Sequence, residues 1–175
     1  MKQVIIFLWL VSVFSVHAQP TLSTKNKKAI ELYTEADNFR VRGQYREALE
    51  LLQQAIEKDK NFSEAYFRQA LIYKSAGDYS KSNDLYLKGL SLNTDPKKQK
   101  AYFLELGENY LLQGDYEKSL QFLDRYLDSE IMNKSKIEQA SLWKRNAQYA
   151  IRNKRIASEF QPHRLTDTEI GRAHV

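Results

Sequence analysis

The sequence predicts an all-α solenoid of about three helix-turn-helix repeats followed by a C-terminal capping helix. The first observation is a Gly-x-Tyr phrase that occurs three times, at Gly43, Gly77 and Gly114. It is separated by 34 residues between the first two copies and by 37 between the last two. The second observation is helix-like apolar patterning on both sides of each copy. A period in the mid-thirties with helices on both sides is typical of stacked helical repeats, whose core is completed only by stacking.

Each glycine marks the turn between the two helices of a pair, and one further helix follows the third pair. The predicted helices, in chain order, cover residues 27–41, 45–58, 63–75, 79–92, 96–112, 116–127 and 134–153.

The predicted boundaries have physical reasons. Asp78 and Asp115 directly precede their helices, where a carboxylate can accept hydrogen bonds from the free N–H groups of the first turn. Asp95-Pro96 places a cap before a proline at the first helical position, where a missing N–H donor costs nothing. The three glycines follow helix ends, where a left-handed backbone is favourable only for glycine.

The composition fits one helical globular domain. The chain has 175 residues, of which 42% are apolar and 28% charged, and these proportions argue against disorder. The formal net charge of +5 arises from basic residues interleaved with acidic ones. A solvated helix surface is therefore favoured over a nucleic-acid partner. The absence of cysteine excludes disulfides, thiolate metal sites, cysteine nucleophiles and a lipid-modified N-terminal cysteine.

The N-terminus is interpreted as an export signal over residues 1–18, followed by a lead-in over residues 19–28. A basic Lys2, an apolar run over residues 4–16 and the small Ala18 form the three regions of a cleavable signal peptide. The rival interpretation is a membrane anchor, but a helix of that run would span about 20 Å. The hydrocarbon core is about 30 Å thick, so cleavage is favoured. An exported protein in the periplasm, or at the periplasmic face of a Gram-negative outer membrane, would meet neither nucleic acid nor ATP.

Aligned on their glycines, the repeats begin at Ala29, Ser63 and Lys100. Residues of the same kind then recur at five positions of the repeat. Large residues stand at position four (Leu32, Tyr66, Phe103) and position twenty-four (Leu52, Tyr86, Leu123), and aromatic residues at position eleven (Phe39, Tyr73, Tyr110). Small residues stand at position eight (Ala36, Ala70, Gly107) and position twenty (Ala48, Ser82, Ser119). This pattern over about residues 29–133 resembles the tetratricopeptide repeat. Tyr126 departs from the small residue of position twenty-seven, and residues 97–99 are inserted before repeat three. The resemblance implies a concave face built by the first helix of each pair.

The repeat domain with its capping helix is expected over residues 29–154. Ile137, Ala140, Leu142 and Trp143 would cover the end of repeat three. Residues 155–168 are interpreted as a linker to a downstream domain. Residues 169–175 are interpreted as the translation of a sequencing adapter, with a genuine short polar C-terminus as the alternative.

The region after the capping helix resembles a junction in large envelope proteins of some Gram-negative bacteria. The shared features are Tyr149-Ala150 and the spacing of Phe160, Pro162 and Leu165, although the cysteine often found before the aromatic-Ala pair is absent. In that group a signal peptide and tetratricopeptide repeats lead into a WD-like propeller and an OmpA-like domain that binds peptidoglycan. Members include a PorE-like component of the type IX secretion apparatus. The resemblance implies a cell-envelope complex and peptidoglycan as partners.

The sequence predicts no enzyme, no cofactor, no metal site and no small-molecule substrate. Outside the leader and the tail, the only histidine is His163 in the linker, so catalytic triads and metal–histidine sites are implausible. Glu105 and Glu108 lie one helical turn apart, but a solvated helix surface is favoured over a paired-carboxylate site. The glycines mark helix ends and form no phosphate-binding loop.

The resemblance assigns function to the concave groove, which we expect to bind a protein or peptide partner as an extended segment or a helix. Its expected residues are Tyr33, Asp37 and Arg40 of repeat one, Glu64, Phe67, Leu71 and Lys74 of repeat two, and Leu104, Glu108 and Leu111 of repeat three. The Lys/Asn carboxylate clamp of chaperone-binding relatives is not reproduced, because its positions hold Tyr33, Asp37 and Phe67. We expect Phe67→Glu to weaken partner binding while leaving the melting temperature nearly unchanged.

The predicted function is an exported protein–protein interaction scaffold that forms the N-terminal module of an OmpA-like envelope protein. A free-standing periplasmic adaptor is one alternative. A SusD-like nutrient-binding protein is another, although such proteins are usually longer and lipid-anchored through cysteine.

Overall fold

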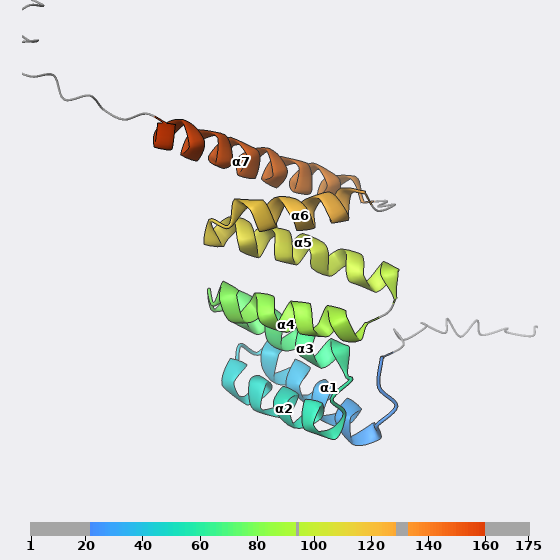
Figure 1. Ribbon diagram of the computed structural model, residues 1–175. Helices are drawn as coiled ribbons and strands as arrows, with labels where there is room; N and C mark the ends of the chain where they lie inside the picture. The colour runs from blue at the N-terminus through green and yellow to red at the C-terminus, as the bar shows by residue number, and fades with distance from the viewer. Residues whose placement is uncertain (1–21, 94, 129–132, 160–175) are drawn as a thin grey trace, which may run out of the picture.

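The computed structural model describes residues 22–93, 95–128 and 133–159, with side chains to residue 155. Over these ranges the chain forms seven α-helices and no strand, which confirms the predicted fold class. The helices are α1 Lys27–Val41, α2 Tyr45–Lys58, α3 Ser63–Ser75, α4 Tyr79–Leu92, α5 Pro96–Gln113, α6 Tyr116–Leu127 and α7 Lys134–Glu159. They stack in chain order as the pairs α1/α2, α3/α4 and α5/α6, with α7 at the end of the stack (Figure 1).

The predicted helix bounds agree with the structure except at two C-terminal ends. Helix α5 extends one residue further, to Gln113, and α7 continues from the predicted end at residue 153 to Glu159. Residues 155–159, predicted to begin the linker, are therefore helical. No glycine or proline interrupts the sequence between residue 153 and Pro162, so nothing local ends the helix there. The predicted signal peptide, the tail and the rest of the linker lie outside the described residues.

The helix ends follow the predicted capping chemistry. The carboxylate Oδ1 atoms of Asp78 and Asp115 accept from the backbone N–H groups of Lys81 and Lys118, at 3.1 and 3.2 Å. Asp95 accepts in the same way from the N–H group of Lys97 at 2.9 Å. Gly43, Gly77 and Gly114 have φ values of 76°, 78° and 78°, so each occupies the left-handed region that was predicted for it.

Asp115→Ala is expected to lower the free energy of unfolding by about 1 kcal/mol at neutral pH, because α6 loses its N-cap. The hydrogen bonds and charge of Lys118 hold the pKa of Asp115 below its ordinary value. A lowered folded-state pKa gives stability that is present above the unfolded-chain pKa of about 3.9, and that is lost as the pH falls through the folded-state value. The difference in Tm between the wild type and Asp115→Ala, measured by circular dichroism, should therefore shrink from pH 7 to pH 2. A difference of unchanged size at pH 2 would show that the carboxylate charge plays no part.

Small residues let the helices of a pair approach closely. Ala36, Ala48, Ala70 and Ser119 are all fully buried, as the repeat register predicts. A Cβ placed on Gly107 of α5 would lie 2.6 Å from Cδ2 of Leu123 on α6. The Ser119 hydroxyl donates to the Gly107 carbonyl oxygen at 2.7 Å, so a hydrogen bond also closes this contact.

The three inserted residues before repeat three lengthen α5 rather than forming a loop. Helix α5 has 18 residues, whereas α3 has 13, and it already begins at Pro96. Further along α5, a polar cluster joins this helix to α4. The buried amide group of Asn109 donates to Ser82 Oγ at 2.9 Å and to Asn83 Oδ1 at 3.0 Å. The junction between repeats two and three is therefore sealed by both apolar and polar contacts.

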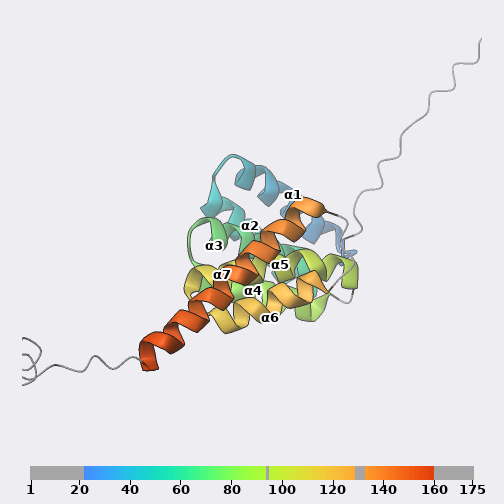
Figure 2. The same cartoon turned by 90° about the horizontal axis from the view of Figure 1, so that it is seen from above.

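Helix α7 covers the end of repeat three, as predicted, and crosses α5 and α6 diagonally when the stack is viewed from above (Figure 2). Within α7, the side chains of Ala140 and Ala147 are fully buried, and the Trp143 side chain packs against the hydrophobic core. Leu142 was expected to cover repeat three but is 47% exposed, and Tyr149 is 68% exposed. Both lie on the side of the helix away from Ala140 and Ala147.

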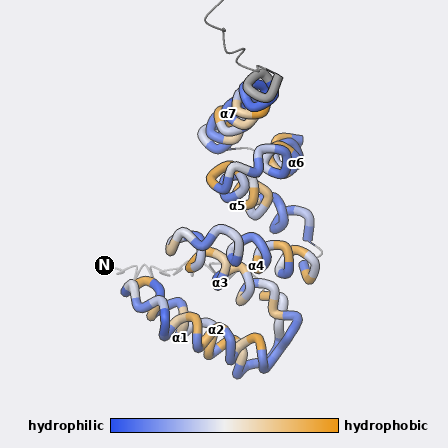
Figure 3. The backbone as a smooth tube through the Cα atoms, turned by 60° about the vertical axis from the view of Figure 1, so that its left-hand side comes forward, coloured by the Kyte–Doolittle hydropathy of each residue, from blue (hydrophilic) through white to orange (hydrophobic). Residues whose placement is uncertain are grey.

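Hydrophobic and hydrophilic stretches alternate along the helices (Figure 3). Among the described residues, no helix combines the length and apolar character needed to cross a bilayer.

Candidate functional site

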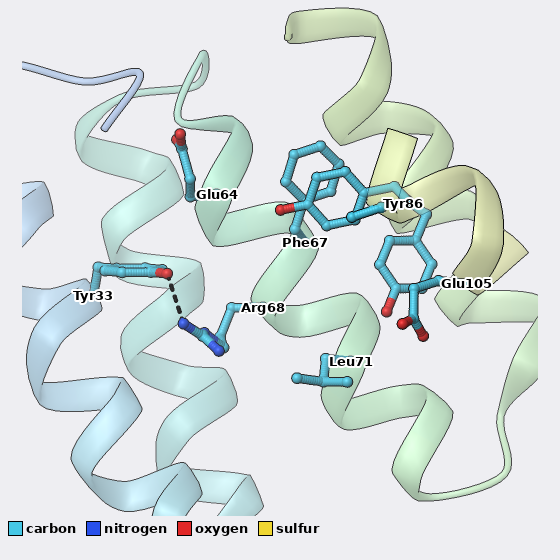
Figure 4. Close-up of a pocket in the computed structure, with 9 residues that line it drawn as sticks. Tyr33, Glu64, Phe67, Arg68, Leu71, Tyr86 and Glu105 are labelled. Carbon is cyan, nitrogen blue, oxygen red and sulfur yellow. Dashed lines mark hydrogen bonds between the residues drawn. The ribbon is translucent and has the colours of Figure 1, made fainter. Parts of the chain in front are cut away.

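A pocket of about 190 Å³ lies where the first helices of the three pairs meet. Its residues, called the groove from here on, are Tyr33 of α1, Glu64, Phe67, Arg68 and Leu71 of α3, Tyr86 of α4, and Ala101, Tyr102 and Glu105 of α5. Figure 4 shows the Tyr33 and Arg68 side chains facing each other on one side, and Phe67 and Tyr86 on the other. Six of the nine are aromatic, aliphatic or alanine side chains, so most of the lining is apolar.

The floor of the groove is a stack of aromatic rings. The Phe67 ring lies on the Tyr102 ring, with centroids 3.5 Å apart and an interplanar angle of 18°, and the Tyr86 ring is 6.4 Å from Phe67. Phe67 is 5% exposed and Tyr86 is 2% exposed. Burial raises the pKa of Tyr102 to about 12 and raises the pKa of Tyr86 as well, so both phenols keep their protons at neutral pH.

Tyr33 and Arg68 form the wall of the groove nearest α1. Arg68 Nη2 donates to the Tyr33 hydroxyl at 2.9 Å, and its Nε lies 3.3 Å from Asp37 Oδ1. That Nε is buried and makes no hydrogen bond, because the ion pair with Asp37 is close but poorly aligned. Asp37 is also held by Arg40, whose Nε donates to the same oxygen at 2.7 Å. Two arginines on neighbouring helices thus share one carboxylate.

Lys74 joins α3 to α5 on the opposite side of the groove. Its ammonium donates to Glu105 Oε2 at 2.5 Å and also to Glu108 Oε2. Burial lowers the pKa of Lys74, but the hydrogen bonds and charges of the two carboxylates outweigh that effect and leave the pKa raised. Glu105 and Glu108 were expected on a solvated helix surface, but both are partly buried and share one cation from another repeat.

Glu64 is held at the rim of the groove by the lead-in to the first helix. The Ser23 backbone N–H and hydroxyl donate to Glu64 Oε2 at 3.1 and 2.5 Å, and Lys98 Nζ lies 3.4 Å from Oε1. Burial alone raises the pKa of Glu64, but the hydrogen bonds from Ser23 and the charge of Lys98 leave it lowered. The lead-in is further fixed by Thr24, whose hydroxyl donates to Asp59 Oδ2 at 2.5 Å.

Of the ten residues expected to form the partner-binding face, four line the groove: Tyr33, Glu64, Phe67 and Leu71. Asp37, Arg40, Lys74 and Glu108 lie beside it in the ion pairs just described. Leu111 is half-buried and does not line the pocket. Whether these side chains contact a partner stays a prediction.

Phe67 and Leu104, both expected on the partner-binding face, are buried in the hydrophobic core, although Phe67 also lines the pocket. Each is 5% exposed, and both pack in one cluster with residues of α4, α5 and α6. In repeat two the reason is the Tyr102 ring of the next repeat, which stacks on Phe67 and covers it. The expectation that Phe67→Glu would leave the melting temperature nearly unchanged does not agree with this burial.

Sequence reasoning missed Arg68, Tyr86, Ala101, Tyr102 and Glu105. The expected concave face took positions five, nine and twelve of each first helix, and position two only in repeat two, so Ala101 at position two of repeat three was left out. Arg68 and Glu105 both occupy position six, next to position five on the same side of a helix, so a wider face would have included them. Tyr102 occupies position three of repeat three, and its contact with Phe67 of the preceding repeat cannot be seen in a register of single repeats.

The described residues hold no group of three or more histidine, aspartate or glutamate side chains placed to bind a metal ion. The groove offers apolar surface, aromatic rings and charged side chains that are held in ion pairs.

Comparison with known proteins identifies the repeats and the fold. Residues 33–96 match the family model of the tetratricopeptide repeat. No curated protein sequence matches the chain significantly. Among solved structures, the N-terminal domain of stress-induced protein-1 (STI-1) from C. elegans is 18% identical, with a TM-score of 0.60 over 66% of this chain and 94% of that one. The first TPR of Spaghetti (RPAP3) bound to the HSP90 peptide SRMEEVD is 16% identical, with a TM-score of 0.61 over 73% of this chain and 98% of that one. The TPR2B domain of yeast Sti1 in complex with pHsp70 is 14% identical, with a TM-score of 0.60 over 70% and 97%.

Proposed function

We propose that this chain, which carries tetratricopeptide repeats and folds as a tetratricopeptide repeat solenoid, is a scaffold that binds a partner protein in its concave groove. The observation that carries the proposal is the apolar pocket formed jointly by α1, α3, α4 and α5. Because ion pairs and stacked rings already fix its walls, a partner segment would bind without the cost of ordering the site. The RPAP3 domain, whose fold this chain shares, is described with a peptide bound, which supports peptide capture as the mode of action.

Site-specific photo-crosslinking in the source cells tests the groove. A benzophenone amino acid at Leu71, which lines the pocket, should crosslink to a defined segment of one partner protein. The matched control is the same amino acid at Leu112, which is 54% exposed on α5 and lies outside the pocket. The proposal fails if both positions give the same products, or if Leu71 gives none while the variant protein stays folded.

We further propose an exported location and an envelope context for this scaffold. Support comes from the signal-like residues 1–18 and from the junction-like residues 149–165, which resemble those of OmpA-like envelope proteins carrying tetratricopeptide and propeller repeats. Two measurements test this. Fractionation should place the native protein outside the cytoplasm, with Gln19 at its N-terminus. Long-read sequencing across the codons for residues 167–175 should continue into propeller repeats. A cytoplasmic protein with residues 1–18 intact would refute export, and a stop codon after Val175 would refute the OmpA-like context.

A further inference from the structure

The charges around the groove cancel one another in pairs. Five ion pairs, none longer than 3.4 Å, join four carboxylates and four cations, namely Asp37, Glu64, Glu105 and Glu108 with Arg40, Arg68, Lys74 and Lys98. The net charge of this set is zero. A charged ligand group would have to compete with a partner already in place and would gain no net attraction. The groove thus lacks the feature by which a terminal carboxylate or an acidic segment would be selected.

The open space in the groove is lined mainly by apolar side chains, together with Glu64, Arg68 and Glu105. Leu71, Phe67, Tyr102 and Tyr33 surround a volume of about 190 Å³ that opens to the concave face. A cavity of about 150 Å³ lined by apolar side chains is large enough to hold benzene. The space therefore suits one bulky apolar side chain, such as leucine or phenylalanine. Leu71 is half-buried and so still has apolar surface to cover.

The Arg68 guanidinium offers hydrogen bonds beside this space. Of its five N–H donors, one is used by the Tyr33 hydroxyl, and the Nε donor is buried beside Asp37, where a ligand cannot reach it. The Arg68 side chain is 25% exposed, which leaves the other Nη donors for a ligand. A main-chain carbonyl of an extended peptide can accept from such a donor without carrying any charge into the groove. An apolar side chain that fills the space and a main-chain carbonyl that accepts a hydrogen bond are both present in an internal peptide segment.

We infer that the groove recognises an uncharged, extended segment within a partner protein. One leucine or phenylalanine side chain of that segment enters the space between Leu71, Phe67 and Tyr102, and a neighbouring main-chain carbonyl accepts from Arg68. This inference rests on the proposed function of the groove and names the chemistry of its ligand. It separates this chain from the RPAP3 domain, whose bound HSP90 peptide SRMEEVD carries three carboxylate side chains.

The probes are capped heptapeptides of alternating glycine and serine that differ only in the central residue, which is leucine, phenylalanine, serine, aspartate or lysine. A sixth probe is SRMEEVD with a free C-terminus. Binding to the full chain is followed by ¹H–¹⁵N NMR through the amide signals of Leu71 and Tyr102. Burying a leucine or phenylalanine side chain predicts at least tenfold tighter binding of those two peptides than of the other four.

Three variants connect the preference to named residues. Leu71→Ser should reduce the preference for leucine over serine at the peptide centre from at least tenfold to less than threefold. Leu112→Ser, at an exposed position of α5 outside the pocket, should leave that preference unchanged. Arg68→Gln should weaken all the capped peptides by a similar factor, because it removes a donor to the main chain and not the apolar space.

The outcomes separate this inference from the proposed function. If SRMEEVD or the aspartate peptide binds best and moves the same amide signals, the apolar-anchor inference is overturned and the groove remains a binding site. An unchanged leucine preference in Leu71→Ser would also overturn the inference. If none of the six probes moves the signals of Leu71 and Tyr102, the inference is overturned, and only the crosslinking experiment still bears on the function of the groove.

Discussion

Replacing Phe67 with glutamate is expected to lower the free energy of unfolding by about 4 kcal/mol or more, enough to unfold the junction between repeats two and three. The ring is 5% exposed and stacks on Tyr102. It also fills the space above Gly89 of α4, where an added Cβ would lie 2.4 Å from Phe67 Cε1. The substitution removes these contacts and places a carboxylate among apolar side chains, with the nearby cations already paired.

Urea unfolding followed by far-ultraviolet circular dichroism measures this effect. Leu112→Glu introduces the same charge at a position that is 54% exposed, and it should change stability by no more than about 0.5 kcal/mol. Phe67→Leu keeps an apolar side chain and should fall between the two. An unfolding midpoint for Phe67→Glu equal to that of the wild type would mean that the ring lies on a free surface rather than in the core.

Gly107→Val is expected to destabilise the α5/α6 pair by about 1–3 kcal/mol or more, because the two backbones approach too closely for a branched side chain. The first added carbon would already lie 2.6 Å from Cδ2 and 2.7 Å from Cγ of Leu123, and Leu123 is fully buried and cannot move aside easily. In a helix without neighbours, alanine would be more stable than glycine by about 1 kcal/mol. We therefore expect Gly107→Ala to lose most or all of that gain and Gly107→Val to be clearly worse.

Thermal unfolding of the glycine series measures this contact. Ala101→Val is the matched control, because Ala101 is exposed on the same helix and reports only the intrinsic cost of a β-branched residue, about 0.5 kcal/mol. If Gly107→Val costs no more than Ala101→Val, the pair has room to separate, and glycine at this position reflects no steric requirement.

The local sequence determines most of this fold. Caps such as Asp78 and left-handed glycines such as Gly77 act over three or four residues, so the helix bounds could be predicted nearly to the residue. The end of α7 could not, because its residues 154–159 lack any stop signal and the helix continues until something ends it. Small residues at position eight, such as Gly107, also revealed the helix pairing.

The candidate site was less predictable, because it forms between repeats rather than within one. Tyr33, Glu64 and Leu71 followed from the register of their own helices. Phe67 is covered by Tyr102, which belongs to the next repeat and lies 35 residues further along the chain. The pairing of Lys74 with Glu105 and Glu108 likewise joins residues 31 and 34 positions apart. A repeat register contains no information on such distances when the spacing between repeats changes.

Helix α3 has a further consequence for how the protein folds and opens. The core is divided into two clusters, one from α1 to α3 and one from α3 to α7. Among the described helices, α3 alone contributes buried side chains to both, with Ala65 and Ile72 in the first and Phe67 and Ala70 in the second. The most extensive contacts join helices that follow one another in the chain. The entropy lost on closing the loops between them is therefore small, and we expect folding to be fast. Cooperativity between the two ends therefore passes through one helix of 13 residues. A partner that tightens α3 would slow amide hydrogen exchange in α2 and in α6 together, although neither of these helices lines the groove.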